Sequence, residues 1–194
     1  RRRRLTPPLR PDLREAWDDL NADAGADAGV GAARFPHHDP WSPYSQLLRW
    51  SLAGDLDLDF TPQRLEQYRL TDGLFANLPG DSTPAVNATA AALMLLNDGR
   101  PRPDALRPDL ERLATLQTQN GGFPATPMAP GPDLLSTATA SLALHCCGRP
   151  APFSLKPFLR QTITDAGGFG AFPGDDTPDL EYTAYGLVAM GLTS

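Results

Sequence analysis

Residues 167–187 read Gly-Gly-Phe-Gly-Ala-Phe-Pro-Gly-Asp-Asp-Thr-Pro-Asp-Leu-Glu-Tyr-Thr-Ala-Tyr-Gly-Leu, and this stretch indicates the fold because it recurs along the chain. One earlier copy occupies residues 72–96, and another begins at residues 121–123 with the same Gly-Gly-Phe turn. A fainter first copy aligns Phe35-Pro36 with the later Leu-Pro and Phe-Pro steps. The period is about 46 residues, and one such repeat cannot bury its own apolar face. The copies are therefore predicted to stack side by side.

Each repeat is predicted to hold two helices of different character. The first set is amphipathic, with leucines at helical spacing and charges between them, which is typical of an outer helix with one wet face. The second set is poor in charge and rich in Ala, Thr, Ser and Leu, which indicates inner helices that are buried on most sides. The outer set is predicted at residues 12–20, 62–70, 104–117 and 153–164, and the inner set at residues 43–53, 84–97, 133–146 and 178–192. Thr83-Pro84 and Thr177-Pro178 are expected to supply an N-cap and a first-turn proline.

Length and composition indicate one globular domain over residues 1–194. The chain has 194 residues, of which 41% are hydrophobic and 21% charged, so it is long enough for a real core and not typical of a disordered chain. Residues 22–33 are low in complexity, and residues 1–33 are expected to form a partly mobile N-terminal segment.

Charge and cysteine content restrict the partners and the compartment. The formal net charge of −6 argues against a nucleic-acid partner. No apolar stretch is long enough to span a bilayer, so no transmembrane segment is predicted. Cys146 and Cys147 are adjacent, which excludes a disulfide framework within the chain and favours a reducing cytoplasm, with both thiols packed as small hydrophobes.

The Gly-Gly-Phe turn, the helix start Pro-Asp-x-x-x-Thr-Ala and the doubled-helix period together resemble the prenyltransferase and terpene-cyclase superfamily. That superfamily includes squalene–hopene cyclases, class II diterpene cyclases and the β subunits of protein prenyltransferases. The resemblance covers about residues 28–193, and it implies an all-α fold in which inner helices ring an apolar cavity that holds an isoprenoid. HEAT-like solenoids share the period, but they do not usually place Gly-Gly-Phe before an Ala/Thr helix.

The resemblance also implies an α/α toroid that is incomplete here. About four helical-hairpin repeats can be counted, fewer than the toroids of the family contain. An open array exposes apolar inner helices at its edge, which monomers avoid. The expected partners are therefore an isoprenoid small molecule and either a second copy of the chain or the remainder of a longer polypeptide.

Residues 179–184 match the helix start at which class II cyclases carry Asp-x-Asp-Asp-Thr-Ala, with Tyr182 in place of the last Asp. The resemblance implies that Glu181 is the proton donor and that Asp179 tunes it by hydrogen bonding. Burial in an apolar cavity would keep such a carboxyl neutral and able to protonate an alkene. The rings of Tyr182, Tyr185 and Phe169 are expected to stabilise a carbocation through their π faces.

One further interpretation of Asp179 and Glu181 stays open. Asp179 and Glu181 lie in the first turn of a helix, where a negative charge interacts favourably with the helix dipole in any protein. The equivalent starts of the other inner helices carry Tyr44, Asn87 and Asp133, which are predicted to contact the substrate.

The resemblance also raises a zinc site of the protein prenyltransferase kind, built from Asp, Cys and His. Asp133 lies near the place of the first ligand, but Leu135 and Ser136 stand where a Cys is needed, and Tyr182 replaces the His. No metal or other cofactor is therefore predicted, apart from Mg²⁺ as the alternative for a diphosphate substrate. The other acidic or histidine groups considered are assigned to helix capping or a surface turn first and to Mg²⁺ or diphosphate second: Asp81, Asp175, Asp176 and His37-His38-Asp39.

The sequence thus predicts an isoprenoid cyclase-like protein that starts a class II reaction by protonation. The alternatives are a toroid that binds a lipid or a protein without catalysis, and a protein related to prenyltransferase β subunits that lacks the zinc site.

Overall fold

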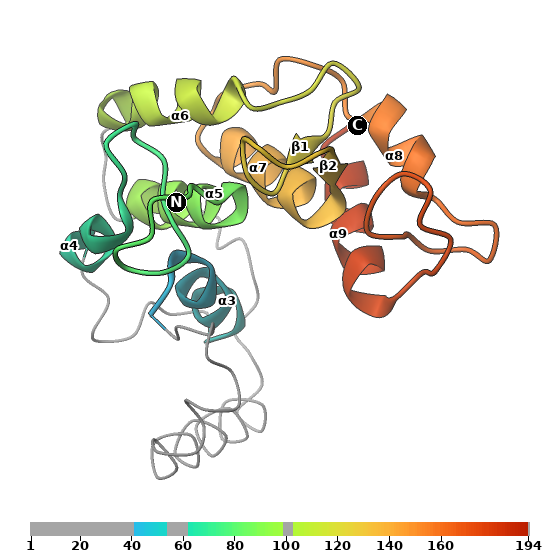
Figure 1. Ribbon diagram of the computed structural model, residues 1–194, viewed down its shortest axis with the longest axis horizontal. Helices are drawn as coiled ribbons and strands as arrows, with labels where there is room; N and C mark the ends of the chain where they lie inside the picture. Colours follow the sequence, from blue (N-terminus) through green and yellow to red (C-terminus); the bar gives the residue numbers. More distant parts are fainter. Residues whose placement is uncertain (1–40, 54–61, 99–102, 194) are drawn as a thin grey trace, which may run out of the picture.

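A computed structural model describes residues 41–53, 62–98 and 103–193, and within them the protein is a row of helices with short outer segments on one side (Figure 1). The inner helices are α3 (Pro43–Ala53), α5 (Val86–Asp98), α7 (Leu134–Cys146) and α9 (Leu180–Gly191). They pack in chain order, so that α5 lies between α3 and α7, and α7 lies between α5 and α9. The all-α expectation is confirmed.

The outer layer is built from shorter pieces. Helix α4 (Pro62–Leu65) continues as the 3₁₀ turn η1 (Glu66–Tyr68), and η2 (Pro103–Leu106) leads into α6 (Arg107–Ala114). The last outer helix is α8 (Lys156–Thr162), which contacts α9. Of the predicted outer helices, the one at residues 12–20 lies outside the described residues, as do residues 1–33, for which mobility is predicted, and His37-His38-Asp39.

Two of the inner helices start later than their prolines predict. Helix α5 begins at Val86 and α9 at Leu180, so Pro84 and Pro178 precede the helices and do not occupy their first turn. In α9 the cap is Asp179, whose side chain accepts the N–H of Tyr182 at 2.7 Å. An Asp at this position is as effective a cap as Ser or Asn, which explains why Thr177 is not needed for it.

One hydrogen-bonding arrangement is repeated in three copies and fixes each turn to its inner helix. The N–H of a phenylalanine donates to the hydroxyl of a threonine on the first turn of the following inner helix. The three pairs are Phe75 with Thr89 at 2.9 Å, Phe123 with Thr137 at 2.8 Å, and Phe169 with Thr183 at 3.2 Å. The same turns carry small strand-like contacts, including the two-residue strands β1 (Phe123–Pro124) and β2 (Pro132–Asp133). The repeat is therefore a hydrogen-bonded unit as well as a sequence pattern.

Burial differs sharply between the inner helices. Helices α5 and α7 are buried along most of their length, because each lies between two inner neighbours. Helix α9 has α7 and α8 as neighbours, and its apolar side chains are largely exposed, with Leu180 at 88% and Leu187 at 61%. The prediction that every inner helix is buried on most sides is therefore wrong for α9 within the described chain. The expectation of a second copy or further repeats stays a prediction.

None of the helices in the described part of the chain is both long and apolar enough to cross a membrane.

Candidate functional site

Several predicted site residues lie at the starts of α7 and α9, and one hydrogen bond between tyrosine hydroxyls joins them to α3. Asp133 caps α7 and Asp179 caps α9, each by accepting the N–H three residues further on. The Asp133 carboxylate accepts from Ser136 N at 2.8 Å. Both carboxylates occupy the same position of the repeat and cap their helices, which supports a structural role for Asp179 at the helix start, while its predicted catalytic role stays a prediction.

The two caps differ in burial, and this difference singles out Asp133. Asp179 is exposed, whereas Asp133 is partly buried and its Oδ2 atom is inaccessible and has no hydrogen-bond partner. Burial raises the pKa of Asp133, against the opposing effect of the hydrogen bonds from Ser136. Asp133 is also close enough to Tyr182 to raise the pKa of that phenol, after burial as the main cause. The carboxyl group of Asp133 is therefore protonated more readily than that of an ordinary exposed Asp.

A chain of hydroxyl groups links the first inner helix to the last. Tyr44 on α3 and Tyr185 on α9 are hydrogen-bonded through their hydroxyls, and Tyr185 donates to Glu181 Oε1 at 3.2 Å. A phenol has one proton to donate and an ionised carboxylate only accepts, so the chain runs from Tyr44 through Tyr185 to Glu181. Burial is the main reason that the pKa values of Tyr44 and Tyr185 are raised. Both phenols therefore keep their protons at neutral pH.

The aromatic residues of the prediction separate into two groups. Tyr182 and Tyr185 are partly buried at the start of α9, with ring centroids 6.4 Å apart and an interplanar angle of 60°. Phe169 is 5% exposed and belongs to the core around α7, α8 and α9. A Cβ on Gly186 would meet the Phe169 ring, so the glycine is what lets this ring pack against α9. Tyr182 and Tyr185 thus lie at the surface of the candidate site, and Phe169 lies in the core against which they pack.

Glu181 and Asn87 lie at equivalent places of the repeat but in different surroundings. Glu181 is exposed and is held by Tyr185, whereas Asn87 is partly buried on α5. The roles predicted for both residues, as donor and as substrate contact, stay predictions.

Asp175, in the turn before α9, uses both carboxylate oxygens for local structure. Oδ2 accepts from Ala171 N at 2.8 Å, and Oδ1 accepts from Thr177 N at 3.1 Å. These hydrogen bonds, that from Ala171 first, lower the pKa of Asp175. Asp175 therefore holds the turn before α9 together and does not cap the helix, whose cap is Asp179, and the alternative role of Asp175 as a Mg²⁺ contact stays a prediction. In the described ranges no three His, Cys, Asp or Glu side chains are grouped closely enough to hold a metal ion.

The burial of Asp133 leads to a stability prediction. We expect Asp133→Asn to raise the free energy of unfolding at pH 7 by about 1 kcal/mol, because Asn caps a helix as well as Asp and burying an amide costs less than burying a charge. A raised pKa means that Asp133 keeps its proton up to a higher pH in the folded state than in the unfolded state. Above the folded-state pKa the buried charge therefore destabilises the wild type, and this cost disappears as the pH falls to the ordinary pKa near 3.8. The free energies of unfolding of the two proteins, measured in urea at pH values from 7 down to 4, should therefore converge as the pH falls.

Asp179→Asn is the matched control, because it changes the same cap on an exposed residue. Its stability should stay within about 0.5 kcal/mol of the wild type at pH 7. An equal gain in both variants would mean that burial of Asp133 is not the cause.

Comparison with known proteins supports the fold. No family model and no curated protein matches the chain. Among solved structures, the protein is similar to the structure described as Candida albicans protein geranylgeranyltransferase-I complexed with GGPP, with a TM-score of 0.62 and 21% sequence identity. The match covers 77% of this chain and 48% of that one, so the chain spans about half the length of the solved structure it matches. The predicted toroid-like array of helical hairpins is confirmed as the fold. Nothing in the comparison bears on squalene–hopene cyclases.

Sequence reasoning placed Asp133 at the site but missed what distinguishes it. Spacing could show that Asp133 and Asp179 are equivalent, because each precedes its threonine by four residues. It could not show that one of them has a buried oxygen without a partner.

Proposed function

We propose that the protein binds an isoprenoid chain against the surface bordered by Tyr44, Tyr182 and Tyr185. The likeness of the fold to a protein whose structure contains GGPP supports the ligand class. The tyrosines support the place, because they offer aromatic faces beside a carboxyl group at the starts of the inner helices. The observation that carries the proposal is the partly buried Asp133 close to Tyr182.

The chemistry we propose for this site is protonation of the isoprenoid, as in a class II cyclisation. The O–H bond of a neutral carboxylic acid breaks while a C–H bond forms at an alkene carbon, which leaves a carboxylate and a tertiary carbocation. The faces of Tyr182 and Tyr185 would stabilise that cation. Ring closure and loss of a proton would then end the reaction and return the acid to its starting state.

Two carboxyl groups compete for the role of donor. Glu181 is the donor that the motif predicts, with Asp179 beside it, and its exposure makes it accessible. Asp133 has the raised pKa that a donor needs, because burial disfavours its charged form. Burial therefore favours Asp133, and the motif favours Glu181.

The test is incubation of the protein with geranylgeranyl diphosphate and with squalene, followed by extraction and mass spectrometry of the products. We expect cyclised product from the wild type and at least a roughly hundredfold loss in the variant of the true donor, since general-acid groups contribute about 10²–10⁴-fold. The variants are Asp133→Asn and Glu181→Gln. Glu111→Gln, on the exposed face of α6, is the control and should retain full activity.

A specific observation also favours the non-catalytic alternative. Asp179 uses a carboxylate oxygen to cap α9 and Glu181 is exposed, which is the arrangement expected of residues with structural roles only. If the wild type binds a fluorescent isoprenoid but turns over neither substrate, the protein is a binding module. Absence of both binding and turnover would contradict the proposed function as a whole.

A further inference from the structure

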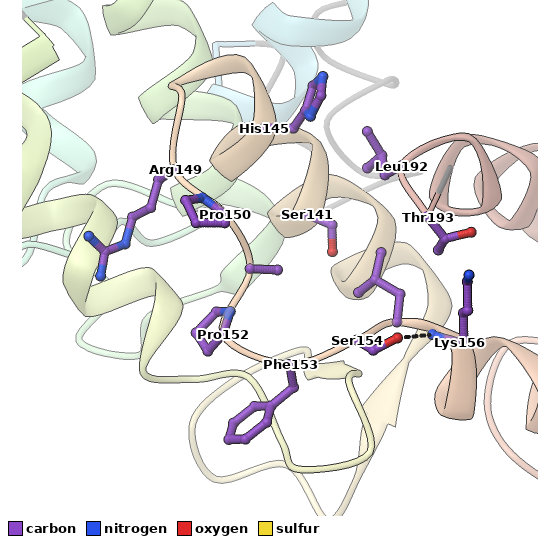
Figure 2. Close-up of a pocket in the computed structure, with 12 residues that line it drawn as sticks. Ser141, His145, Arg149, Pro150, Pro152, Phe153, Ser154, Lys156, Leu192 and Thr193 are labelled. Atoms are coloured by element: carbon purple, nitrogen blue, oxygen red, sulfur yellow. Dashed lines mark hydrogen bonds between the residues drawn. The ribbon is translucent and has the colours of Figure 1, made fainter.

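A second site lies at the opposite ends of the inner helices. A pocket of about 400 Å³ opens between the C-terminal ends of α7 and α9 and the segment that leads into α8 (Figure 2). Its basic lining residues are His145, Arg149 and Lys156, and no acidic residue lines it. In a chain with a formal net charge of −6, a pocket whose ionisable lining residues are all basic is a local reversal of the overall charge.

Ser141 is the residue that makes this pocket unlike the same place in the neighbouring repeats. It lies four residues after Thr137, and the residues four after Thr89 and Thr183 are Leu93 and Leu187. A serine therefore stands where the other two copies have a leucine. The shorter side chain leaves space at this level of α7, and it places a hydroxyl group where the other helices have only carbon.

The Ser141 hydroxyl is buried and has no partner. Ser141 is 4% exposed, its Oγ has no hydrogen-bond partner, and Figure 2 shows the hydroxyl directed into the hollow of the pocket. A buried hydroxyl without a partner forgoes a hydrogen bond that water would have supplied. A ligand that brings a hydrogen-bond acceptor into the pocket would supply the partner that this hydroxyl lacks.

The basic side chains differ in their freedom to meet such an acceptor. The Arg149 guanidinium turns toward α6, where Nη1 lies 3.5 Å from Glu111 Oε1, so a carboxylate already faces it. In the part of the chain that the structure describes, Lys156 and His145 form no ion pair. The Lys156 ammonium stands on the side of the pocket toward Thr193 (Figure 2). Lys156 is therefore the cation best placed to neutralise a charge inside.

We propose that this pocket binds a small oxyanion carried on a short apolar group, such as a phosphate monoester or a carboxylate. The Ser141 hydroxyl donates a hydrogen bond to the oxyanion, and Lys156 supplies the charge. Leu155 and Leu192 line the apolar part. The volume is at the lower end of the range for small-molecule sites, which restricts the ligand to one ring or a few carbons. The site is separate from the isoprenoid surface, and it stands whether or not the proposed function is right.

The test is calorimetric titration of the whole chain with phenyl phosphate, benzoate and inorganic phosphate. We expect saturable binding of at least one of the two aromatic oxyanions and weaker binding of inorganic phosphate, which lacks the apolar part. The stronger of phenyl phosphate and benzoate identifies the oxyanion. No saturable binding of either up to about 10 mM would overturn the proposal, because even a single charged hydrogen bond with apolar contact supports millimolar affinity.

Three variants connect the binding to the pocket. Lys156→Gln should weaken it about tenfold, which is the loss of one charge-assisted hydrogen bond. Ser141→Leu should abolish it by filling the space with the residue that the neighbouring repeats carry, and Ser141→Ala should weaken it about fivefold without filling the space. Arg160→Gln, which removes an exposed charge on α8 outside the pocket, should leave the affinity unchanged.

Equal weakening by Lys156→Gln and Arg160→Gln would overturn the proposal, because it would mean that net charge alone attracts the anion. Thermal unfolding of each variant shows that it is folded. If Ser141→Leu is not folded, Ser141→Ala and Lys156→Gln still decide the question, and unchanged affinity in both would place the binding elsewhere.

Discussion

We expect Gly121→Ala to lower the free energy of unfolding by about 4 kcal/mol, because two separate penalties coincide at this turn. Gly121 has a φ of +95°, a left-handed conformation that costs a residue with a Cβ about 1–2 kcal/mol. A Cβ there would also meet the carbonyl group of Ser154, whose carbon would lie 2.8 Å away. The obstacle is backbone, so no side-chain rotation relieves it.

The repeat provides a matched control for this experiment. Gly167 occupies the same place in the next copy, with a φ of +85° and nothing within 4 Å of an added Cβ. Gly167→Ala should therefore lose only the conformational part, about 1–2 kcal/mol. Urea unfolding of both variants measures the difference. If Gly121→Ala were as stable as Gly167→Ala, the close approach of the Ser154 backbone would not constrain the turn.

The hydrogen bonds of Gln117 explain why Gly121→Ala is expected to lose more stability than Gly167→Ala. Its side chain donates to Gly121 O at 2.8 Å and to Phe153 O at 3.0 Å, and it accepts from Phe153 N at 2.8 Å. This clamp draws the 153–155 segment against the turn, which is why a Cβ has no room there. A buried glutamine with three backbone partners is a polar network that specifies one arrangement of the two segments.

The inner helices could be predicted nearly to the residue, whereas the outer helices could not. A run of small apolar residues without a polar face is a local property, so residues 43–53 and 133–146 could be identified from the sequence. The outer helices end earlier because their last carbonyl groups accept from the following turn. Tyr68 O accepts from Ala76 N, and Thr162 O accepts from Gly170 N. These bonds are not visible in a periodic pattern.

The candidate site could be predicted as a set of residues but not as an arrangement. Repeat alignment placed Tyr44 at the level of Glu181, yet its hydroxyl meets Tyr185, one turn further along α9. That contact joins residues 141 positions apart and depends on the curvature of the array, which is a tertiary property. The exposure of α9 is likewise not a property of its own sequence, because α5 and α7 have similar composition and are buried by their neighbours.

The repeated phenylalanine–threonine hydrogen bond leads to the second large effect. Thr137 is fully buried, and its hydroxyl accepts from Phe123 N at 2.8 Å while donating to Asp133 O at 2.6 Å. Valine has nearly the same shape as threonine, but its side chain can neither accept nor donate a hydrogen bond. We expect Thr137→Val to lower the free energy of unfolding by about 2–3 kcal/mol, because the buried Phe123 N–H is left without a partner.

Thr139→Val on the same helix separates this effect from the general loss of a hydroxyl. Thr139 is 6% exposed, and its hydroxyl donates to Leu135 O at 2.8 Å but accepts no backbone N–H. Removing this hydroxyl leaves no backbone N–H without a partner, so it should lower the free energy of unfolding by less than about 1 kcal/mol. Thr89→Val, which breaks the equivalent bond to Phe75, should match Thr137→Val. Urea unfolding gives the stabilities, and faster amide exchange at Phe123 should accompany the Thr137 variant. Equal losses at Thr137 and Thr139 would mean that the repeat is held by the packing of its helices, and that the hydrogen bond between turn and helix adds little.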